Sequence, residues 1–318
     1  MMKLKWPSLL AGVSLSLAFG GTPAEAALNR VWVSGKGLDQ PSCGALVSPC
    51  RQINYAITNG IVAAGGEINI LDPTGFAPFT IATALSIVND GVGTASIQQS
   101  SPGGNAITIT APANAPIMLR GLSIEGLGVA ANGVSFTSGA SLDVVNCVIR
   151  HFTTAGVNVT TNAAVKFNLI DSLVSDIAAS GVKLSPGGAL IGSVLRSTLI
   201  NNGANAFSLD GSAAASSAGV MITVADSNAS NNGGAGFAVL SGAGQSLATL
   251  VATRSIASGN VGAGFNVGAN SVLRLSHSVA AGNAIGVNIT GGTAYSLGDN
   301  SLSANNSATA GLTADPAQ

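Results

Sequence analysis

The chain has 318 residues, of which only 8% are charged, and a formal net charge of −1 at pH 7. A hydrophobic fraction of 47% excludes an intrinsically disordered chain, and the 42 glycines lack the strict period of collagen. The near-balance of 12 basic and 13 acidic residues, with no basic cluster, argues against a nucleic-acid partner.

The N-terminal segment has the features of a secretory signal peptide. Lys3 and Lys5 precede an apolar stretch at residues 9–19, and Ala-Glu-Ala at residues 24–26 supplies the small residues of a cleavage site. The apolar stretch is shorter than the roughly 20 residues that a membrane-spanning helix needs. We therefore expect a signal peptide at residues 1–26, a mature start at Ala27, and export to the periplasm or the medium. No membrane span is expected after cleavage.

Residues 27–66 are expected to form an N-terminal strand followed by a capping helix. Residues 50–59 place Ile53, Ala56 and Ile57 on one helical face, and Gly60 ends the pattern. Such a helix would cover the end of a stacked fold, where unpaired strand edges otherwise favour aggregation.

The three cysteines divide into a close pair and a single residue. Cys43 and Cys50 are near enough in sequence to form a small disulfide, which export would allow. Cys147 lies within a repeat and is expected to be a buried, unreactive thiol. None of the three has the spacing to a histidine that a metal site requires, and we predict no metal site.

A repeat of about 25 residues dominates residues 67–306. Each coil begins with a charged or amide residue and a short apolar strand, continues through an Asn-rich turn, and then gives a Gly-apolar-x-apolar strand and a third strand. The coils that align most clearly begin at Arg120, Asn146, Asp171, Arg196, Asp226, Arg254, His277 and Asp299.

These coils predict an all-β fold, a single-stranded parallel β-helix in which each coil contributes three strands. Short runs of alternating residues separated by Gly and Asn indicate strands and turns. Gly and Asn recur too often for the helices of an α-solenoid, and a leucine-rich horseshoe would repeat its leucines in a tighter pattern. Residues 307–318 lose the repeat and are expected to be a frayed tail.

Two columns of the alignment support this stacking. The seventh residue of each of the last five coils is an asparagine, and stacked amides about 4.8 Å apart can hydrogen-bond into a ladder. The ladder residues are Asn202, Asn232, Asn260, Asn283 and Asn305. Five residues further on, Phe207, Phe237 and Phe265 share a column that should point inward.

The first column of the coils alternates in charge along much of its length. A ladder of ion pairs at a turn is one interpretation, because it offsets like-charge repulsion and fixes the register. The other interpretation is a groove for a polar polymer, in which Arg196 would bind substrate.

The sixth column holds the strongest catalytic candidates, Glu125, His151 and Asp176, with Arg150 beside them as a candidate for substrate binding. Carboxylates about 9–10 Å apart across a histidine could act as the acid and base of an inverting hydrolase. They could instead polarise His151 as a base, or bind a cation together with Asn201. A solvated turn with a hydrogen-bonded histidine is the competing structural interpretation.

The segments VWVSGKGLD, SPCRQINYAI and GGEINILDPTGF, followed by Asn-laddered coils, resemble the pectin lyase-like superfamily of right-handed parallel β-helices. They are most similar to exported bacterial proteins described as right-handed parallel β-helix repeat-containing proteins. The likeness covers residues 30–306, and it alone implies the hand of the helix. The superfamily contains pectate lyases, polygalacturonases, pectin methylesterases, phage depolymerases and non-catalytic adhesins, so it implies a polysaccharide partner without naming a reaction.

The catalytic motifs of two of these enzyme groups are missing. Pectate lyases of this fold hold Ca²⁺ with clustered carboxylates, and polygalacturonases use neighbouring aspartates with Gly-His-Gly and Arg-Ile-Lys segments. The chain contains no Asp-Asp pair and neither tripeptide. We therefore expect no cofactor; Ca²⁺ stays open as an alternative, although no motif supports it. Three readings stay open: a polysaccharide lyase, a glycoside hydrolase, or a non-catalytic structural or adhesin-like module. The sequence leaves the oligomeric state open.

Overall fold

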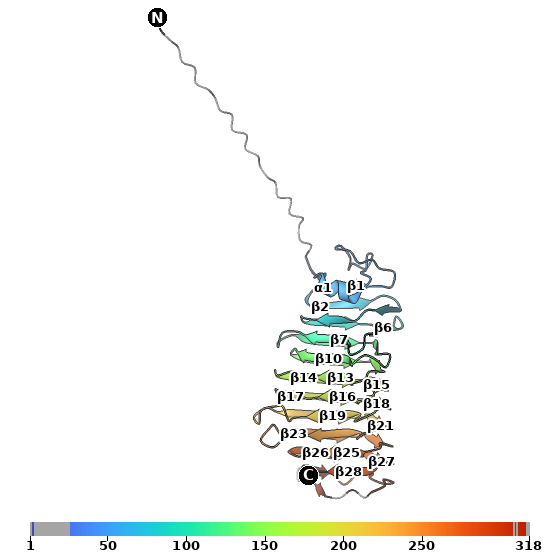
Figure 1. The fold of residues 1–318 in the computed structure, drawn as a ribbon, viewed down its shortest axis with the longest axis vertical. Coiled ribbons are helices and arrows are strands. Elements are labelled where there is room, and N and C mark those ends of the chain that lie inside the picture. The colour runs from blue at the N-terminus through green and yellow to red at the C-terminus, as the bar shows by residue number, and fades with distance from the viewer. Residues whose placement is uncertain (1, 3–25, 308, 310, 316–318) are drawn as a thin grey trace.

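A computed structural model describes residues 2, 26–307, 309 and 311–315 and shows a tall stack of coils (Figure 1). The chain runs along this stack from its N-terminal to its C-terminal end. The predicted signal peptide lies almost entirely outside the described residues. Within the described part, no helix is both long enough and apolar enough to span a bilayer.

Three parallel sheets form the sides of the stack. In the described residues, sheet A has 12 strands in the spatial order β1 (Leu28–Val33), β2 (Val62–Ile70), β5 (Leu85–Val88), β8 (Pro116–Arg120), β11 (Ser141–Val145), β14 (Val165–Ile170), β17 (Leu190–Leu195), β20 (Val220–Ala225), β23 (Ala248–Thr253), β26 (Ser271–Ser276), β29 (Thr293–Ser296) and β30 (Leu312–Ala314).

The two other sheets each have nine strands among the described residues. Sheet B consists of β3 (Thr74–Phe76), β6 (Ala95–Gln98), β9 (Leu122–Glu125), β12 (Val148–Arg150), β15 (Leu173–Ser175), β18 (Thr198–Ile200), β21 (Asn228–Ser230), β24 (Ile256–Ser258) and β27 (Val279–Ala281). Sheet C consists of β4 (Phe79–Ile81), β7 (Asn105–Thr110), β10 (Asn132–Ser138), β13 (Ala155–Val159), β16 (Ser180–Leu184), β19 (Phe207–Asp210), β22 (Phe237–Leu240), β25 (Ala263–Val267) and β28 (Ile285–Ile289).

Each coil contributes one strand to each sheet, as in β11, β12 and β13, before the chain returns to sheet A at β14. The alternation within a strand explains the packing: in β11, Leu142 and Val144 are buried while Asp143 between them is partly exposed. Leu142 lies opposite Phe167 on the next coil, which is also buried. The predicted parallel solenoid of three-strand coils is confirmed.

The N-terminal end contains a short helix, α1 (Ile53–Thr58), with Ile53 and Ala56 buried. It contacts β2 and β4 and lies at the N-terminal end of the stack (Figure 1). The helix is shorter than the predicted span of residues 50–59. Strand β2 begins at Val62, earlier than the predicted residue 67, because it continues through the adjacent glycines 65 and 66, where its pairing with β1 shifts register.

The C-terminal tail also differs from the prediction. Within residues 307–318, Leu312–Ala314 form β30, which pairs in parallel with β29. Leu312 packs against the hydrophobic core, and the backbone N–H of Asp315 donates to the carbonyl of Ser296 at 3.1 Å. These residues therefore extend sheet A and are not frayed.

The asparagine ladder is confirmed. Each side-chain amide donates to the Oδ1 of the next rung, at 2.9 Å for Asn202 to Asn232 and 2.8 Å for Asn232 to Asn260. The two further rungs, to Asn283 and Asn305, measure 2.9 and 3.1 Å. The phenylalanine column is present beside it, with ring centroids 6.3 Å apart for Phe207–Phe237 and 5.5 Å apart for Phe237–Phe265. Both columns fix the register of neighbouring coils.

A second polar ladder, which the sequence analysis missed, runs along the turn between sheets A and B. Each side-chain oxygen accepts a hydrogen bond from the backbone N–H of the same position on the preceding coil, as from Ser172 to Ser197 at 3.2 Å. The members are Ser172, Ser197, Ser227, Ser255 and Ser278, with the N–H of Cys147 bound to Ser172 at one end. The sequence carries this signal, because serine is the second residue of each of these coils.

Cys147 occupies this serine position as a buried free thiol. Burial raises the pKa of the Cys147 thiol to about 11. Since the thiolate is the reactive form, we expect no modification of native protein by a thiol reagent at neutral pH, and labelling of one thiol after denaturation. Mass spectrometry after iodoacetamide treatment measures both. Rapid labelling of the folded chain would contradict the expectation.

The predicted disulfide is present between Cys43 and Cys50, both of which are buried. It closes a short loop whose end joins β1 through the pairing of Val33 with Cys50. Removing such a crosslink raises the entropy of the unfolded chain, so Cys43→Ser/Cys50→Ser should lower the free energy of unfolding by about 2 kcal/mol. Denaturant unfolding measures the change, with Cys147→Ser as the control. A double variant as stable as the parent would contradict the prediction.

Candidate functional site

The turns between sheets B and C set the positions of two of the three predicted catalytic residues. His151 and Asp176 follow β12 and β15 directly, and both have left-handed backbones, with φ of 59° and 57°. Asp, Asn and His tolerate this conformation better than most residues. Because Arg150 pairs with Ser175, His151 and Asp176 occupy the same position on consecutive coils. Both side chains are exposed.

Glu125 does not belong to that column, and here the predicted register is wrong by one residue. It lies opposite Arg150 in the pairing of β9 with β12. The alignment took Arg120 as the start of the coil, but Arg120 is the last residue of β8 and pairs with Val145. The left-handed residue in this coil is Gly121, with φ of 72°.

The shift nevertheless brings Glu125 into direct contact with two of the other predicted site residues. Its Oε1 lies 2.7 Å from Nδ1 of His151, and its Oε2 accepts a hydrogen bond from Nε of Arg150 at 2.9 Å. The backbone N–H of Leu127 also donates to Oε1, at 3.2 Å. The side chain of Glu125 is 13% exposed, whereas those of Arg150 and His151 are 48% and 45% exposed. The carboxylate therefore holds an imidazole and a guanidinium whose outer ends face solvent.

This cluster lies in an open groove of about 660 Å³ on the outer face of sheet B. The groove crosses β6, β9 and β12 and is bounded by the turn that contains Leu127. Its lining consists of Thr94, Ser96, Gln98, Ser123, Glu125, Leu127, Gly128, Arg150 and His151. Three hydroxyls, from Thr94, Ser96 and Ser123, and the amide of Gln98 contribute uncharged polar groups, and Leu127 adds an exposed apolar side chain.

Asp176 and Arg196 do not line this groove. Asp176 is placed one coil beyond His151. Arg196 lies on the other side of sheet B, at the turn from sheet A, where its Nε and Nη2 donate to both carboxylate oxygens of Asp171 at 2.7 and 2.9 Å. The hydrogen bonds from Arg196 hold the pKa of the Asp171 carboxyl below its usual range.

The first column therefore consists largely of ion pairs between neighbouring coils. Arg254 binds Asp226 with the same two-point geometry, at 2.7 and 2.9 Å, and Nδ1 of His277 lies 3.0 Å from a carboxylate oxygen of Asp299. These contacts support the interpretation as a register-fixing ladder. Because the guanidinium groups of Arg196 and Arg254 are paired with carboxylates, the column does not present a row of unpaired cations to a polymer.

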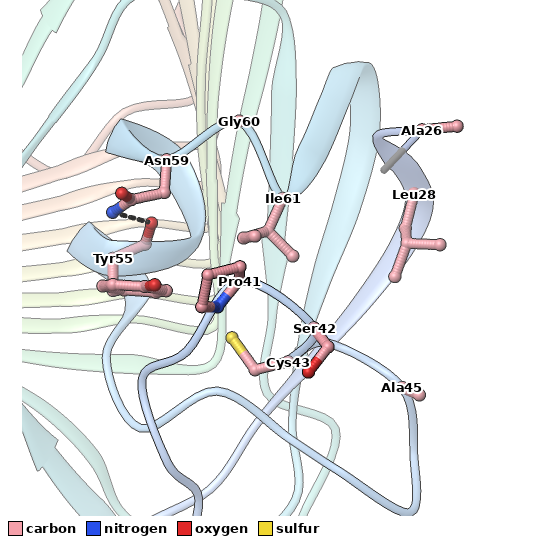
Figure 2. Close-up of a pocket in the computed structure, with 10 residues that line it drawn as sticks. All are labelled: Ala26, Leu28, Pro41, Ser42, Cys43, Ala45, Tyr55, Asn59, Gly60 and Ile61. Carbon is pink, nitrogen blue, oxygen red and sulfur yellow. Dashed lines mark hydrogen bonds between the residues drawn. The ribbon is translucent and has the colours of Figure 1, made fainter. Parts of the chain in front are cut away.

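A second pocket lies at the N-terminal end of the stack, between the disulfide loop, α1 and the start of β1 (Figure 2). It has a volume of about 410 Å³, and its lining includes the apolar or aromatic side chains of Leu28, Pro41, Tyr55 and Ile61. The amide of Asn59 donates to the carbonyl of Tyr55 at 3.1 Å. Among the described residues that line the pocket, none carries a formal charge, and Tyr55 is the one side chain with a titratable group.

No protein-family model matches the chain, and no curated protein matches it. Among solved structures, the crystal structure of pectate lyase Pel9A matches with a TM-score of 0.51, covering 91% of this chain and 78% of that chain. The chain therefore shares a parallel β-helix fold with Pel9A. Sequence identity to Pel9A is 16%, so the likeness establishes the fold alone, and the lyase activity belongs to Pel9A.

Proposed function

We propose that the chain is an exported β-helix protein that binds an extracellular or cell-surface polysaccharide in the groove over β6, β9 and β12. The observation that carries the proposal is the groove itself, with Glu125, Arg150 and His151 joined in its lining. Export is supported by the signal-like sequence of residues 1–26.

The groove suits a chain of sugars in shape and in chemistry. It is open along the outer face of a sheet, and parallel strands repeat its polar side chains at intervals of about 4.8 Å. Ser96 pairs with Ser123, and Gln98 pairs with Glu125, so two polar rows run across the strands. These groups can exchange hydrogen bonds with sugar hydroxyls, while Leu127 can contact the apolar face of a sugar ring.

The same cluster supplies the groups for a proton transfer. Glu125 engages Nδ1 of His151, and within the described residues Nε2 of His151 has no hydrogen-bond partner. A carboxylate that orients an imidazole leaves the second ring nitrogen to act as a general base. We include this role of His151, positioned by Glu125, in the proposal; Asp176 lies outside the groove and has no part in it.

Arg150→Ala tests the binding site. We expect this substitution to weaken polysaccharide binding at least about tenfold, because it removes a groove side chain and releases Glu125. The matched control is Arg254→Ala, which removes an exposed arginine with a similar ion pair to a neighbouring coil, outside the groove. Affinity electrophoresis of the mature protein from Ala27 measures both. Equal effects of the two substitutions would contradict the site.

Catalysis is tested separately by incubating the mature protein with neutral and uronate-containing polysaccharides and measuring reducing ends and unsaturated uronides. Product formation that His151→Ala abolishes would assign the base. Binding without product would leave a non-catalytic module, which is the second candidate function. The observation in favour of that second function is that Glu125, Arg150 and His151 already satisfy one another, as in a structural ion-pair network.

A further inference from the structure

We infer that the groove over β6, β9 and β12 takes a neutral glycan and binds it without Ca²⁺. This inference rests on the proposed function and specifies its substrate class. It is distinct from the acidic polymer that the name of pectate lyase Pel9A denotes.

The fixed charges that line the groove are already paired with one another. Its charged or titratable lining is limited to Glu125, Arg150 and His151. The guanidinium of Arg150 is matched by the carboxylate of Glu125 at 2.9 Å, and the imidazole of His151 contacts the other oxygen of that carboxylate at 2.7 Å, so the one permanent cation of the groove is already paired. A polyuronate brings a carboxylate on every sugar. Such a chain would lose hydration in the groove without gaining an unmatched cation, and that transfer is unfavourable.

The arginine nearest to this cluster along sheet A is also paired. Nε of Arg120 lies 2.8 Å from a carboxylate oxygen of Asp90. The pair adds no net positive charge to this end of the stack. This arginine therefore adds little long-range attraction for a polyanion, because opposite charges a few ångströms apart largely cancel beyond about 10 Å at physiological salt.

The groove residues do not fit a calcium site. Ca²⁺ requires about six to eight oxygen ligands, usually including several carboxylates. Both oxygens of Glu125 are occupied by Arg150, His151 and the N–H of Leu127, so binding the ion would displace these donors and leave two basic groups beside it. No group of three or more His, Cys, Asp or Glu side chains in the described part of the chain is placed to hold a metal ion.

The other polar side chains that line the groove suit a ligand rich in hydroxyl groups. Thr94, Ser96, Gln98 and Ser123 are uncharged, and each can both donate and accept. Sugar hydroxyls also donate and accept, so these side chains can pair with a neutral glycan without burying any net charge. The groove therefore favours a ligand that is rich in hydroxyl groups and lacks carboxylates.

The experiment compares binding of galactan, xyloglucan, galactomannan and polygalacturonate by the mature protein, each in EGTA and in excess Ca²⁺. We expect at least one neutral polymer to bind at least about tenfold more tightly than polygalacturonate, with an affinity that changes less than about twofold between EGTA and Ca²⁺. Ser96→Ala/Ser123→Ala should weaken this binding. Ser208→Ala, a partly exposed serine on β19 of sheet C, should leave it unchanged.

The outcomes separate the two levels of the proposal. Preferential binding of polygalacturonate, or affinity that rises about tenfold with Ca²⁺, would overturn the neutral-glycan inference and leave polysaccharide binding intact. Failure of every polymer to bind would overturn the proposed function itself. Glu125→Gln gives a further check, because it leaves Arg150 unmatched and should increase binding of polygalacturonate at low salt. No increase would count against the charge argument.

Discussion

Replacing Asn232 by alanine is expected to lower the free energy of unfolding by about 3–5 kcal/mol, because the side chain joins three coils. Its Oδ1 accepts from the backbone N–H and the amide of Asn202, at 3.0 and 2.9 Å. Its amide donates to Oδ1 of Asn260 at 2.8 Å and to the carbonyl of Leu199 at 3.3 Å. Asn232 is 1% exposed, so water cannot replace these bonds. Alanine would leave several buried polar groups without partners.

The measurement is denaturant unfolding followed by circular dichroism. The control is Asn231→Gly, one residue earlier, where the asparagine is exposed and has φ of 58°. Glycine adopts that backbone without strain, so the control should change stability by no more than about 0.5 kcal/mol. If both variants unfolded at the same denaturant concentration, the ladder would not be the source of stability that its geometry indicates.

The sequence was sufficient to predict the parallel solenoid because every coil repeats the same pattern of inward-facing and outward-facing residues. Asn202 and Asn232 hydrogen-bond as the alignment requires, and Phe207 pairs with Phe237 as expected. Equivalent positions in successive coils have the same environment, so where the pattern of one coil is ambiguous, the other coils settle which residues form strands and which form turns. The serine ladder was missed although Ser172 and Ser197 stand in equivalent positions, because serine is common in turns and its recurrence does not by itself indicate a hydrogen bond to a neighbour's backbone.

The site was predicted only in part, and the reason lies in one irregular coil. In this coil Gly121 occupies the turn position where most other coils have a charged or amide residue, and the charged Arg120 is the last residue of β8. Aligning the coils by their first charged residue therefore displaced Glu125 by one position. The groove also includes Thr94 and Ser96 from before the first clear repeat, and Leu127 and Gly128 from the turn after β9. Only the folded backbone brings these segments together.

Gly264→Val is expected to destabilise the protein by about 3 kcal/mol, because a glycine is needed where sheet C approaches the asparagine ladder. A Cβ at this position would lie 2.8 Å from the carbonyl oxygen of Gly286 and 2.8 Å from Cβ of Ala280. It would also lie 3.0 Å from Nδ2 of Asn283. These neighbours are backbone or fully buried side chains, so they cannot move aside without breaking a hydrogen bond or shifting a coil.

Gly219→Ala is the matched control, because no atom lies within 4 Å of the added Cβ and the glycine precedes β20 directly. Alanine there should leave stability unchanged or raise it slightly by restricting the unfolded chain. Thermal and denaturant unfolding of the two variants measure the difference. If Gly264→Val unfolded at the same temperature and denaturant concentration as Gly219→Ala, there would be room for a side chain between sheet C and the asparagine ladder. The presence of Gly236 and Gly264 would then be explained by turn propensity alone, and not by their close contact with the ladder.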